Sequence, residues 1–395
     1  MTDATALEDI QPAIVFDHVD IVFGQNPARA LTLLDAGGAR DDILRDTGSV
    51  IGVADASLAV AQGEICVLMG LSGSGKSTLL RAVNQLNRVS RGRVLVLHGG
   101  AHVDVGGCDA ETLREVRSRS VAMVFQQFGL LPWRSVRDNV GFGLELRGMG
   151  KPERTNVVDE KLAMVGLTQW ADKAVNELSG GMQQRVGLAR AFATDAQILL
   201  MDEPFSALDP LIRTKLQDEL LDLQRRLKKT ILFVSHDLDE ALKIGNRIAI
   251  MEGGRIVQVG VAEDIVLKPA TPYVAEFVAH MNPMHVLSAA AVMQRMDTLA
   301  VDMHGILIDR AANVRLRLDD AGKPAGATLD GRDLPLVQGR AQAGALTCVS
   351  CDIKLHEAIV LRRASPHPLA LVDRNSVFVG LCGDSDIFRG LLRDL

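Results

Sequence analysis

Polar and apolar positions alternate at the start of the chain and then give way to short apolar runs. Residues 13–23, AIVFDHVDIVF, have the two-residue period of a half-buried strand. A helical stretch interrupted at residues 35–40 follows, and residues 52–64 form a second strand pattern leading into the apolar run 65–69. From there to about residue 265, short strand-like runs alternate with longer helical ones. This alternation predicts an α/β fold with a largely parallel sheet.

The alternation ends at the proline pair of KPATP, residues 268–272. A helix-like stretch, TPYVAEFVAHM, then leads into a segment of different character, residues 285–395. We therefore predict a first domain over residues 13–270 and a smaller domain over residues 285–395. The strand and helical insertion of residues 1–60 belong to the first domain. These 60 residues hold ten Asp or Glu against three Lys or Arg, which we interpret as a solvated acidic arm.

Composition and charge narrow the function classes. Charged residues make up 23% and hydrophobic ones 47%, as in globular proteins. The net charge of −6 argues against a general nucleic-acid binder, which carries a basic face. No apolar run approaches the roughly 20 residues of a membrane span, and MTDATALEDIQP lacks the features of a secretory signal. We expect a cytoplasmic chain whose membrane role depends on a partner.

The five cysteines are Cys66, Cys108, Cys348, Cys351 and Cys382. An odd number without a regular framework fits a reducing compartment. Cys348 and Cys351 form a C-x-x-C pair, but a zinc site needs a second pair or histidines at matching spacing. We interpret the pair as small apolar strand residues.

Residues 70–77, GLSGSGKS, fit the phosphate-loop pattern G-x-x-x-x-G-K-[ST]. Glycines let the backbone N–H groups turn inward around a triphosphate. Lys76 would reach the β- and γ-phosphates, the Ser77 hydroxyl would bind Mg²⁺, and a helix beginning at Ser77 would face the anion with its N-terminus. The apolar strand pattern of residues 65–69 precedes the loop, and a phosphate loop lies between a strand and a helix. The predicted ATP-binding residues here are Gly70, Ser72, Gly73, Gly75, Lys76, Ser77 and Thr78.

Two further apolar runs end in polar residues. Residues 198–201 lead into Asp202 and Glu203, and residues 231–235 lead into His236. Ligands bind at the carboxyl ends of parallel strands, so these side chains should meet at one sheet edge. We predict that Asp202 holds Mg²⁺ through water, that Glu203 is the general base for the attacking water, and that His236 bonds the γ-phosphate.

Residues 178–185, LSGGMQQR, resemble the signature motif of ABC ATPases. Ser179, Gly180 and Gly181 would present a helix N-terminus with free N–H groups, which forms a second anion site. In that family this site binds the γ-phosphate of ATP held by the other subunit, so the resemblance implies a homodimer. It also implies a phosphate-loop NTPase fold with a RecA-like core and a helical subdomain.

Other positions also match this family. Gln126 matches the glutamine that senses Mg²⁺ and links the ATP site to the membrane subunit. Residues 206–209, SALD, match the loop that crosses the dimer interface, and Asp209 is its predicted nucleotide-site residue. Phe23 is the predicted aromatic that stacks on adenine. The apolar stretch 127–133 is either a docking patch for a membrane partner or core of the helical subdomain.

A closer resemblance covers nearly the whole chain. The ATPases of glycine betaine, proline betaine and choline importers have a helical insertion that residues 23–31 and 41–47 resemble. Their sequences are also similar to this chain at residues 209–214, 235–241 and 250–254. Residues 132–133 and 281–284 look nearer to the choline branch. The resemblance implies an ATP-hydrolysing subunit at the cytoplasmic face of the plasma membrane, beneath a separate permease and indirectly a substrate-binding protein. Alternatives are an importer of another small solute or a soluble ABC ATPase without a transport role.

Residues 368–373, 379–380 and 386–388 look like one CBS repeat, and residues 285–340 like a degenerate partner repeat. We therefore expect a small α+β, CBS-like domain. Adenosine-binding repeats commonly carry Ser or Thr three residues before the aspartate, and here Gly383 stands before Asp386. A regulatory sensor and a structural tail that steadies the dimer both remain open.

Overall fold

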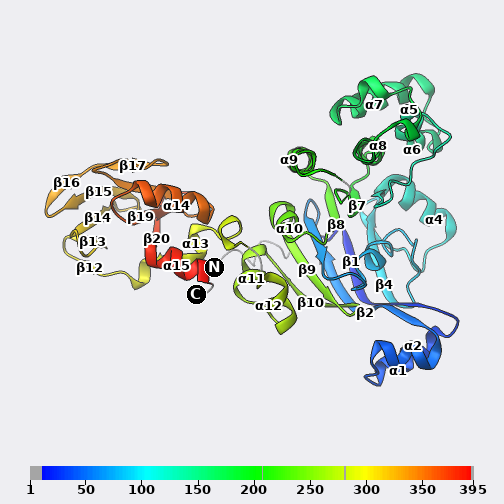
Figure 1. Cartoon of the computed structure of the whole chain (residues 1–395), viewed down its shortest axis with the longest axis horizontal. Coiled ribbons are helices and arrows are strands. Elements are labelled where there is room, and N and C mark those ends of the chain that lie inside the picture. Colours follow the sequence, from blue (N-terminus) through cyan, green and yellow to red (C-terminus); the bar gives the residue numbers. More distant parts are fainter. Residues whose placement is uncertain (1–10, 207, 280–281, 393–395) are drawn as a thin grey trace. The chain divides into compact units, whose positions relative to one another are not determined.

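The computed structural model describes residues 11–206, 208–279 and 282–392 (Figure 1). The chain divides into two compact units, residues 1–261 and 262–395. The division precedes the predicted boundary at 270, so residues 262–270 group with the C-terminal unit. Residues 1–10 of the acidic N-terminal arm, Ala207 of the SALD loop, and His280 and Met281 lie outside the described residues.

The first unit contains two sheets. The larger one consists of β3 (Ile65–Met69), β6 (Val121–Val124), β7 (Ile198–Asp202), β8 (Thr230–Val234), β9 (Arg247–Glu252) and β10 (Arg255–Gly260). Its order is β10-β9-β3-β8-β7-β6, and all neighbours are parallel except β9 and β10. The smaller sheet is antiparallel, in the order β2-β1-β4-β5, and consists of β1 (Ile14–Phe23), β2 (Val50–Val60), β4 (Arg91–His98) and β5 (Ala101–Asp104). The predicted parallel α/β sheet is confirmed.

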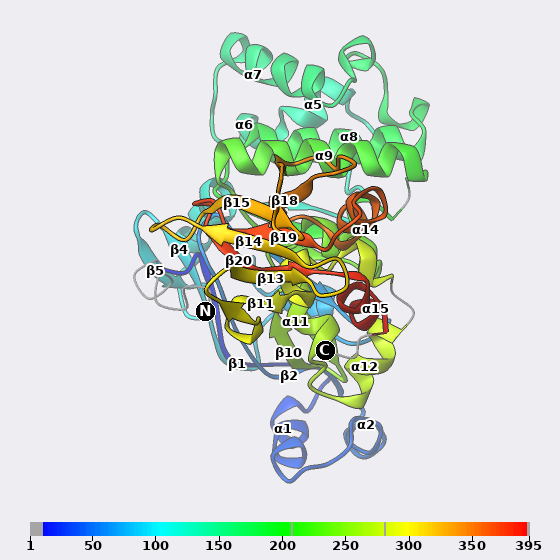
Figure 2. The ribbon, with the colours of Figure 1, turned by 90° about the vertical axis from the view of Figure 1, so that its left-hand side faces the viewer.

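Among the described residues, separate hydrophobic clusters form the two-sheet core, the helical subdomain and the base of the insertion. The largest joins the two sheets, with Phe16 from β1 packed in the same core as Leu68 and Leu200 from the parallel sheet. A second forms the helical subdomain, and a third ties the insertion to β1 and β2. Figures 1 and 2 place the insertion helices α1 (Pro27–Asp35) and α2 (Arg40–Thr47) at the opposite end of the unit from α5–α7. The remaining helices are α3 (Lys76–Leu80), α4 (Ala110–Glu115), α5 (Val136–Val140), α6 (Phe142–Leu146), α7 (Lys151–Met164), α8 (Gly180–Ala193), α9 (Pro210–Leu227) and α10 (Leu238–Ile244).

The helix after the phosphate loop is shorter than its sequence predicts. It was expected over residues 77–83, but α3 spans Lys76–Leu80 and tight turns follow. Ala82 and Val83 donate to carbonyls three residues back, and Asn84 accepts from the Leu86 N–H with its own side chain. Such side-chain bonds compete with helical ones. Among the described residues, no helix is long and apolar enough to cross a membrane.

The second unit combines a mixed and an antiparallel sheet around one core. The mixed sheet has the order β11-β20-β19-β18-β17: β11 (Gln294–Arg295), β20 (Phe378–Cys382), β19 (Leu369–Val372), β18 (Leu346–Ser350) and β17 (Leu336–Gln338). The antiparallel one contains, in chain order, β12 (Val301–Asp302), β13 (Gly305–Asp309), β14 (Val314–Leu318), β15 (Pro324–Leu329) and β16 (Arg332–Leu334). The helices are α11 (Ala262–Leu267), α12 (Pro272–Ala279), α13 (Ala289–Val292), α14 (Leu355–Ala364) and α15 (Asp384–Leu392).

The two halves of the predicted CBS-like region differ in structure. Residues 346–392 run β18-α14-β19-β20-α15, which alternates strands with helices. Residues 301–334, all of them described, form the antiparallel sheet without an α-helix between its strands. The alternation of apolar and basic residues in β14, VRLRL, accounts for this: Val314 and Leu316 face the core, whereas Arg315 and Arg317 do not.

Candidate functional site

The phosphate loop connects β3 to α3 and depends on glycine at its close approaches. A Cβ on Gly70 would lie 2.1 Å from the Met251 carbonyl oxygen, and one on Gly75 would lie 2.4 Å from that of Gly52. Both residues also have positive φ angles. The buried Lys76 ammonium donates to the carbonyls of Gly70 and Leu71 at 2.8 and 2.9 Å. Burial lowers the pKa of Lys76, and the charges of Glu203 and Asp202 oppose that shift.

Asp202 ends β7 fully buried, and both of its oxygens accept hydrogen bonds. The Ser77 hydroxyl donates to Oδ1 at 2.7 Å, while Nε and Nη2 of Arg81 donate to Oδ2 at 3.0 and 2.7 Å. The structure thus joins the predicted residues Ser77 and Asp202. Sequence reasoning missed Arg81. Its spacing of four from Ser77 was the available signal, because side chains four apart lie on the same side of a helical turn.

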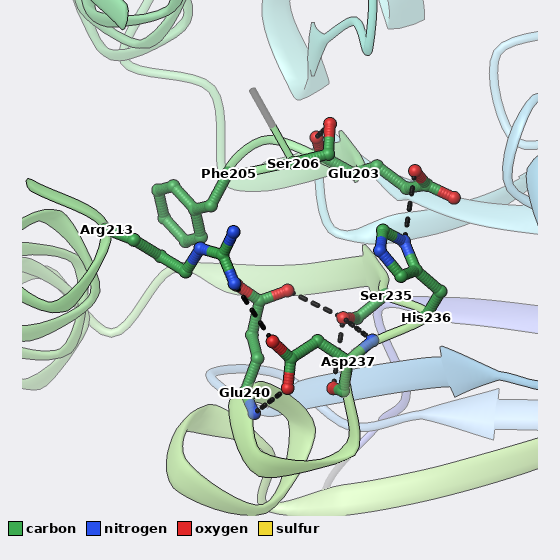
Figure 3. A pocket seen from close by; sticks show the side chains of 8 residues that line it. All are labelled: Glu203, Phe205, Ser206, Arg213, Ser235, His236, Asp237 and Glu240. Carbon is green, nitrogen blue, oxygen red and sulfur yellow. Dashed lines mark hydrogen bonds and ion pairs between the residues drawn. The ribbon is translucent and has the colours of Figure 1, made fainter. Parts of the chain in front are cut away.

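Glu203, Gln126 and His236 converge next to this carboxylate. The Glu203 Oε2 atom accepts from Gln126 Nε2 at 2.9 Å and lies 3.2 Å from His236 Nδ1 (Figure 3). The last residues of β7 and β8 are paired in parallel, which brings the two strand ends together as predicted. Glu203 has a φ of 48°, an uncommon conformation for a residue with a side chain. Its carbonyl is held by the N–H and the hydroxyl of Ser206.

The insertion contributes to the surroundings of the phosphate loop. Phe23, at the end of β1, is 42% exposed, and a Cβ on Gly52 would lie 2.7 Å from its ring and 3.1 Å from the Thr78 methyl group. The Phe23 ring and Thr78 therefore flank the same backbone position. Arg40, at the start of α2, donates to the carbonyl of Gly73 at 3.5 Å and to that of Ile51. No sequence pattern indicates Arg40, because its acceptors are backbone atoms.

The signature residues lie on the helical subdomain. Ser179 caps α8, its hydroxyl accepting from the Met182 N–H at 3.4 Å, and Gly180 and Gly181 form the first turn. Helix α8 packs into the helical core, which shares no residue with the core beneath the phosphate loop. Asp209 likewise caps α9, accepting from the Ile212 N–H at 3.1 Å. Ser179, Gly180 and Asp209 are exposed, so the start of each helix lies at the surface of the chain.

The apolar stretch after Gln126 contains both side chains that pack in the core and side chains that are exposed to solvent. Leu130 packs against the helical core, whereas the Trp133 side chain is 77% exposed. A groove lies nearby, between β6 and the helical subdomain, and its lining includes Met123, Phe125 and Phe142.

In the second unit, the Asp386 carboxylate bonds one residue before α15 and one residue within it. The Gly383 N–H donates to its Oδ2 at 2.8 Å, and Arg389 donates to its Oδ1 at 2.6 Å. All five cysteines are unpaired, and Cys66, Cys348 and Cys382 are buried. Burial raises the pKa of the Cys348 thiol to about 11, as expected of small apolar strand residues.

The phosphate loop, the strand-end carboxylates and the Ser-Gly-Gly helix start together define an ATPase of the ABC class. A family model described as "ABC transporter" matches residues 53–206. The ATP-binding protein ProV of the glycine betaine/proline betaine transport system of Escherichia coli is 41% identical over 387 residues, which cover 94% of this chain and 96% of ProV. The chain therefore belongs to the family of ATP-binding subunits of ABC transporters.

Other comparisons agree with this assignment. The glycine betaine/carnitine transport ATP-binding protein GbuA of Listeria monocytogenes is 48% identical over 304 residues, 77% of this chain and 75% of GbuA. Among solved structures, the dimeric bacterial ABC transporter cassette MJ0796 is 28% identical with a TM-score of 0.54, over 63% of this chain and 98% of that one. A post-hydrolysis state of MJ0796 bound to ADP and Pi has a TM-score of 0.53.

Proposed function

We propose that this ABC-type ATPase energises the uptake of quaternary ammonium compounds through a separate membrane permease. The observation that carries the catalytic part is the convergence of Gln126 and His236 on Glu203, next to the pair formed by Ser77 and Asp202. The likeness to ProV extends over nearly the full length of both chains, and it supports glycine betaine and proline betaine as solutes. Choline remains part of the proposal because of residues 132–133.

Hydrolysis begins with ATP seated on the phosphate loop and its adenine against Phe23. Lys76 exchanges its bonds to the loop carbonyls for bonds to the β- and γ-phosphates. Glu203 takes a proton from the water as its oxygen attacks the γ-phosphorus; the bond from the γ-phosphorus to the bridging oxygen breaks, ADP leaves, and His236 beside Glu203 bonds the γ-phosphate. In a pair of chains, Ser179, Gly180 and Gly181 of the partner complete the site with helix N–H groups, and Asp209 lies in the loop at the interface.

The residues around Ser77 fit a magnesium ion. The Ser77 hydroxyl donates its hydrogen bond to Asp202, so its oxygen lone pairs remain available, and hydroxyl, carboxylate and amide oxygens suit this hard cation. Ser77 and Gln126 would hold the ion directly and Asp202 through a water molecule. When bound, it would neutralise charge on the β- and γ-phosphates.

The proposed assembly contains two copies of this chain, a permease and, through the permease, a substrate-binding protein. The exposed Trp133 and the adjoining groove supply an apolar surface for a permease segment at the cytoplasmic face of the membrane. For residues 285–395 we propose a structural role as a CBS-like tail. The bonds from Gly383, just before α15, and from Arg389 within α15 engage both oxygens of Asp386, which favours this role over nucleotide sensing.

The first experiment compares Glu203→Gln with the wild type. Hydrolysis should fall by about 10²–10⁴-fold, the usual contribution of a general base. ATP binding should persist, so the variant should elute as a dimer in gel filtration with ATP. Glu153→Gln, on the exposed side of α7, is the matched control. Undiminished hydrolysis by Glu203→Gln would remove Glu203 from the catalytic role.

A second arm tests the solute. Uptake of labelled glycine betaine and labelled choline is measured in the native host with wild-type and Glu203→Gln chains. Loss of either uptake supports the proposal and ranks the solutes. Unchanged uptake of both would overturn the solute assignment and leave the ATPase assignment in place.

A further inference from the structure

The loop that carries His236 is fixed on both sides of the histidine. The His236 side chain is 61% exposed, so packing alone does not hold it against Glu203. Ser235, before it, is buried, and its hydroxyl accepts from the Asp237 N–H at 2.9 Å and bonds Glu240 at 2.6 Å. Asp237, after it, caps α10 by accepting from the Glu240 N–H at 3.1 Å. The position of His236 therefore follows from its two neighbours.

Helix α9 holds these neighbours with two donors one turn apart. Arg213 Nη1 donates to Asp237 Oδ2 at 3.0 Å, and Gln217 Nε2 donates to Glu240 Oε1 at 3.0 Å (Figure 3 shows the first contact). Gln217 and Glu240 are both buried. A hydrogen bond between a guanidinium and a carboxylate is stronger than one between neutral groups. A network of linked hydrogen bonds keeps a loop in one conformation.

Arg213 also reaches the loop that follows Glu203. Its Nη2 donates to the Leu208 carbonyl at 3.4 Å, while Nη1 holds Asp237. One guanidinium thus joins the loop after Glu203 to the loop of His236. We propose that Arg213 is a positioning residue that sets the 3.2 Å approach of His236 to Glu203. This inference rests on the proposed catalytic roles of those two residues.

The test measures ATP hydrolysis by the purified full chain as kcat and KM separately. In Arg213→Ala, kcat should fall roughly tenfold, because small misplacements near the reacting atoms are costly. KM should stay within about twofold, because the phosphate loop is untouched. Arg213→Lys should recover only part of kcat, since one ammonium cannot match the two-armed guanidinium. Arg225→Ala is the control: this arginine lies on the same helix and pairs with the exposed Asp222.

A second variant guards against misfolding. Asp237→Asn keeps a capping oxygen for α10 but weakens the pair with Arg213. It should lower kcat in the same direction, and the double variant should be no slower than Arg213→Ala alone. A lowered melting temperature with unchanged kcat per folded chain would reduce Arg213 to a structural residue and overturn the inference.

The same assay separates this inference from the proposed function. Wild-type turnover by Arg213→Ala beside an inactive Glu203→Gln variant would overturn the role of Arg213 alone. Wild-type turnover by Glu203→Gln would overturn the proposed function itself.

Discussion

Removal of the Arg81 guanidinium should destabilise the nucleotide-free protein, because Arg81 forms the ion pair with the buried Asp202. The Asp202 side chain is 0% exposed, and without Arg81 it would keep one hydrogen bond, from Ser77. Breaking a buried ion pair by removing one partner costs about 3–5 kcal/mol. The Arg81 side chain is 38% exposed, so water would reach the vacated space, and we expect roughly 2–3 kcal/mol for Arg81→Ala.

The assay is urea unfolding of Arg81→Ala with and without Mg²⁺ and ADP. A divalent cation beside Asp202 would restore part of the missing charge, so the deficit should shrink when both are present. Adding Asp202→Asn to Arg81→Ala should also recover stability without ligand, because no buried charge then remains uncompensated. Arg88→Ala is the control, an exposed arginine in the same segment with no ion pair among the described residues, and it should cost below about 0.5 kcal/mol.

The reasoning fails if Arg81→Ala unfolds at the same urea concentration as Arg88→Ala. It also fails if Asp202→Asn adds its own full cost to that of Arg81→Ala. Independent costs would mean that the two side chains are not coupled, in spite of their 2.7 Å contact.

Two further predictions concern neighbouring side chains. Phe23→Ala should weaken ATP binding by about 1–3 kcal/mol, the worth of one stacked base, while Phe23→Trp should not. A nucleotide titration by fluorescence decides, and equal affinities would exclude stacking. Burial raises the pKa of Glu240, so the folded chain keeps this proton where the unfolded chain loses it, and stability falls as pH rises through that window. Glu240→Gln should remove this part of the pH dependence, and identical stability-pH curves would contradict it.

The sequence was sufficient where local pattern determines structure. Alternation predicted β1, and apolar runs predicted β3, β7 and β8 within one residue of their observed ends. The strand-end residues Asp202, Glu203 and His236 could be placed on one edge because parallel strands share it. The glycines of the phosphate loop were identified from spacing, and the close contacts around Gly70 and Gly75 give the physical reason.

The missed contacts depend on residues far apart in the chain. Arg81 and Asp202 are separated by 121 positions, and Arg213 and Asp237 by 24. The spacing of four between Ser77 and Arg81 does not reveal Asp202 as the acceptor, and Arg40 donates to backbone carbonyls that any residue could offer. The antiparallel sheet of residues 301–334 was not predicted. The resemblance to a CBS repeat favoured alternating strands and helices, whereas the alternation of apolar and basic residues in β14 favours strands alone.

The adjacent carboxylates Asp202 and Glu203 lie in different surroundings, which supports the different roles that we propose for them. Asp202 is fully buried, and both of its carboxylate oxygens already accept hydrogen bonds, one from Ser77 and the other from Arg81. A carboxylate engaged in this way acts on a cation by orienting the Ser77 hydroxyl. Glu203 follows the strand with a positive φ, and the bonds of its carboxylate among the described residues go to the exposed side chains of Gln126 and His236. Of the two, we infer that Glu203 is the one free to accept a proton from water.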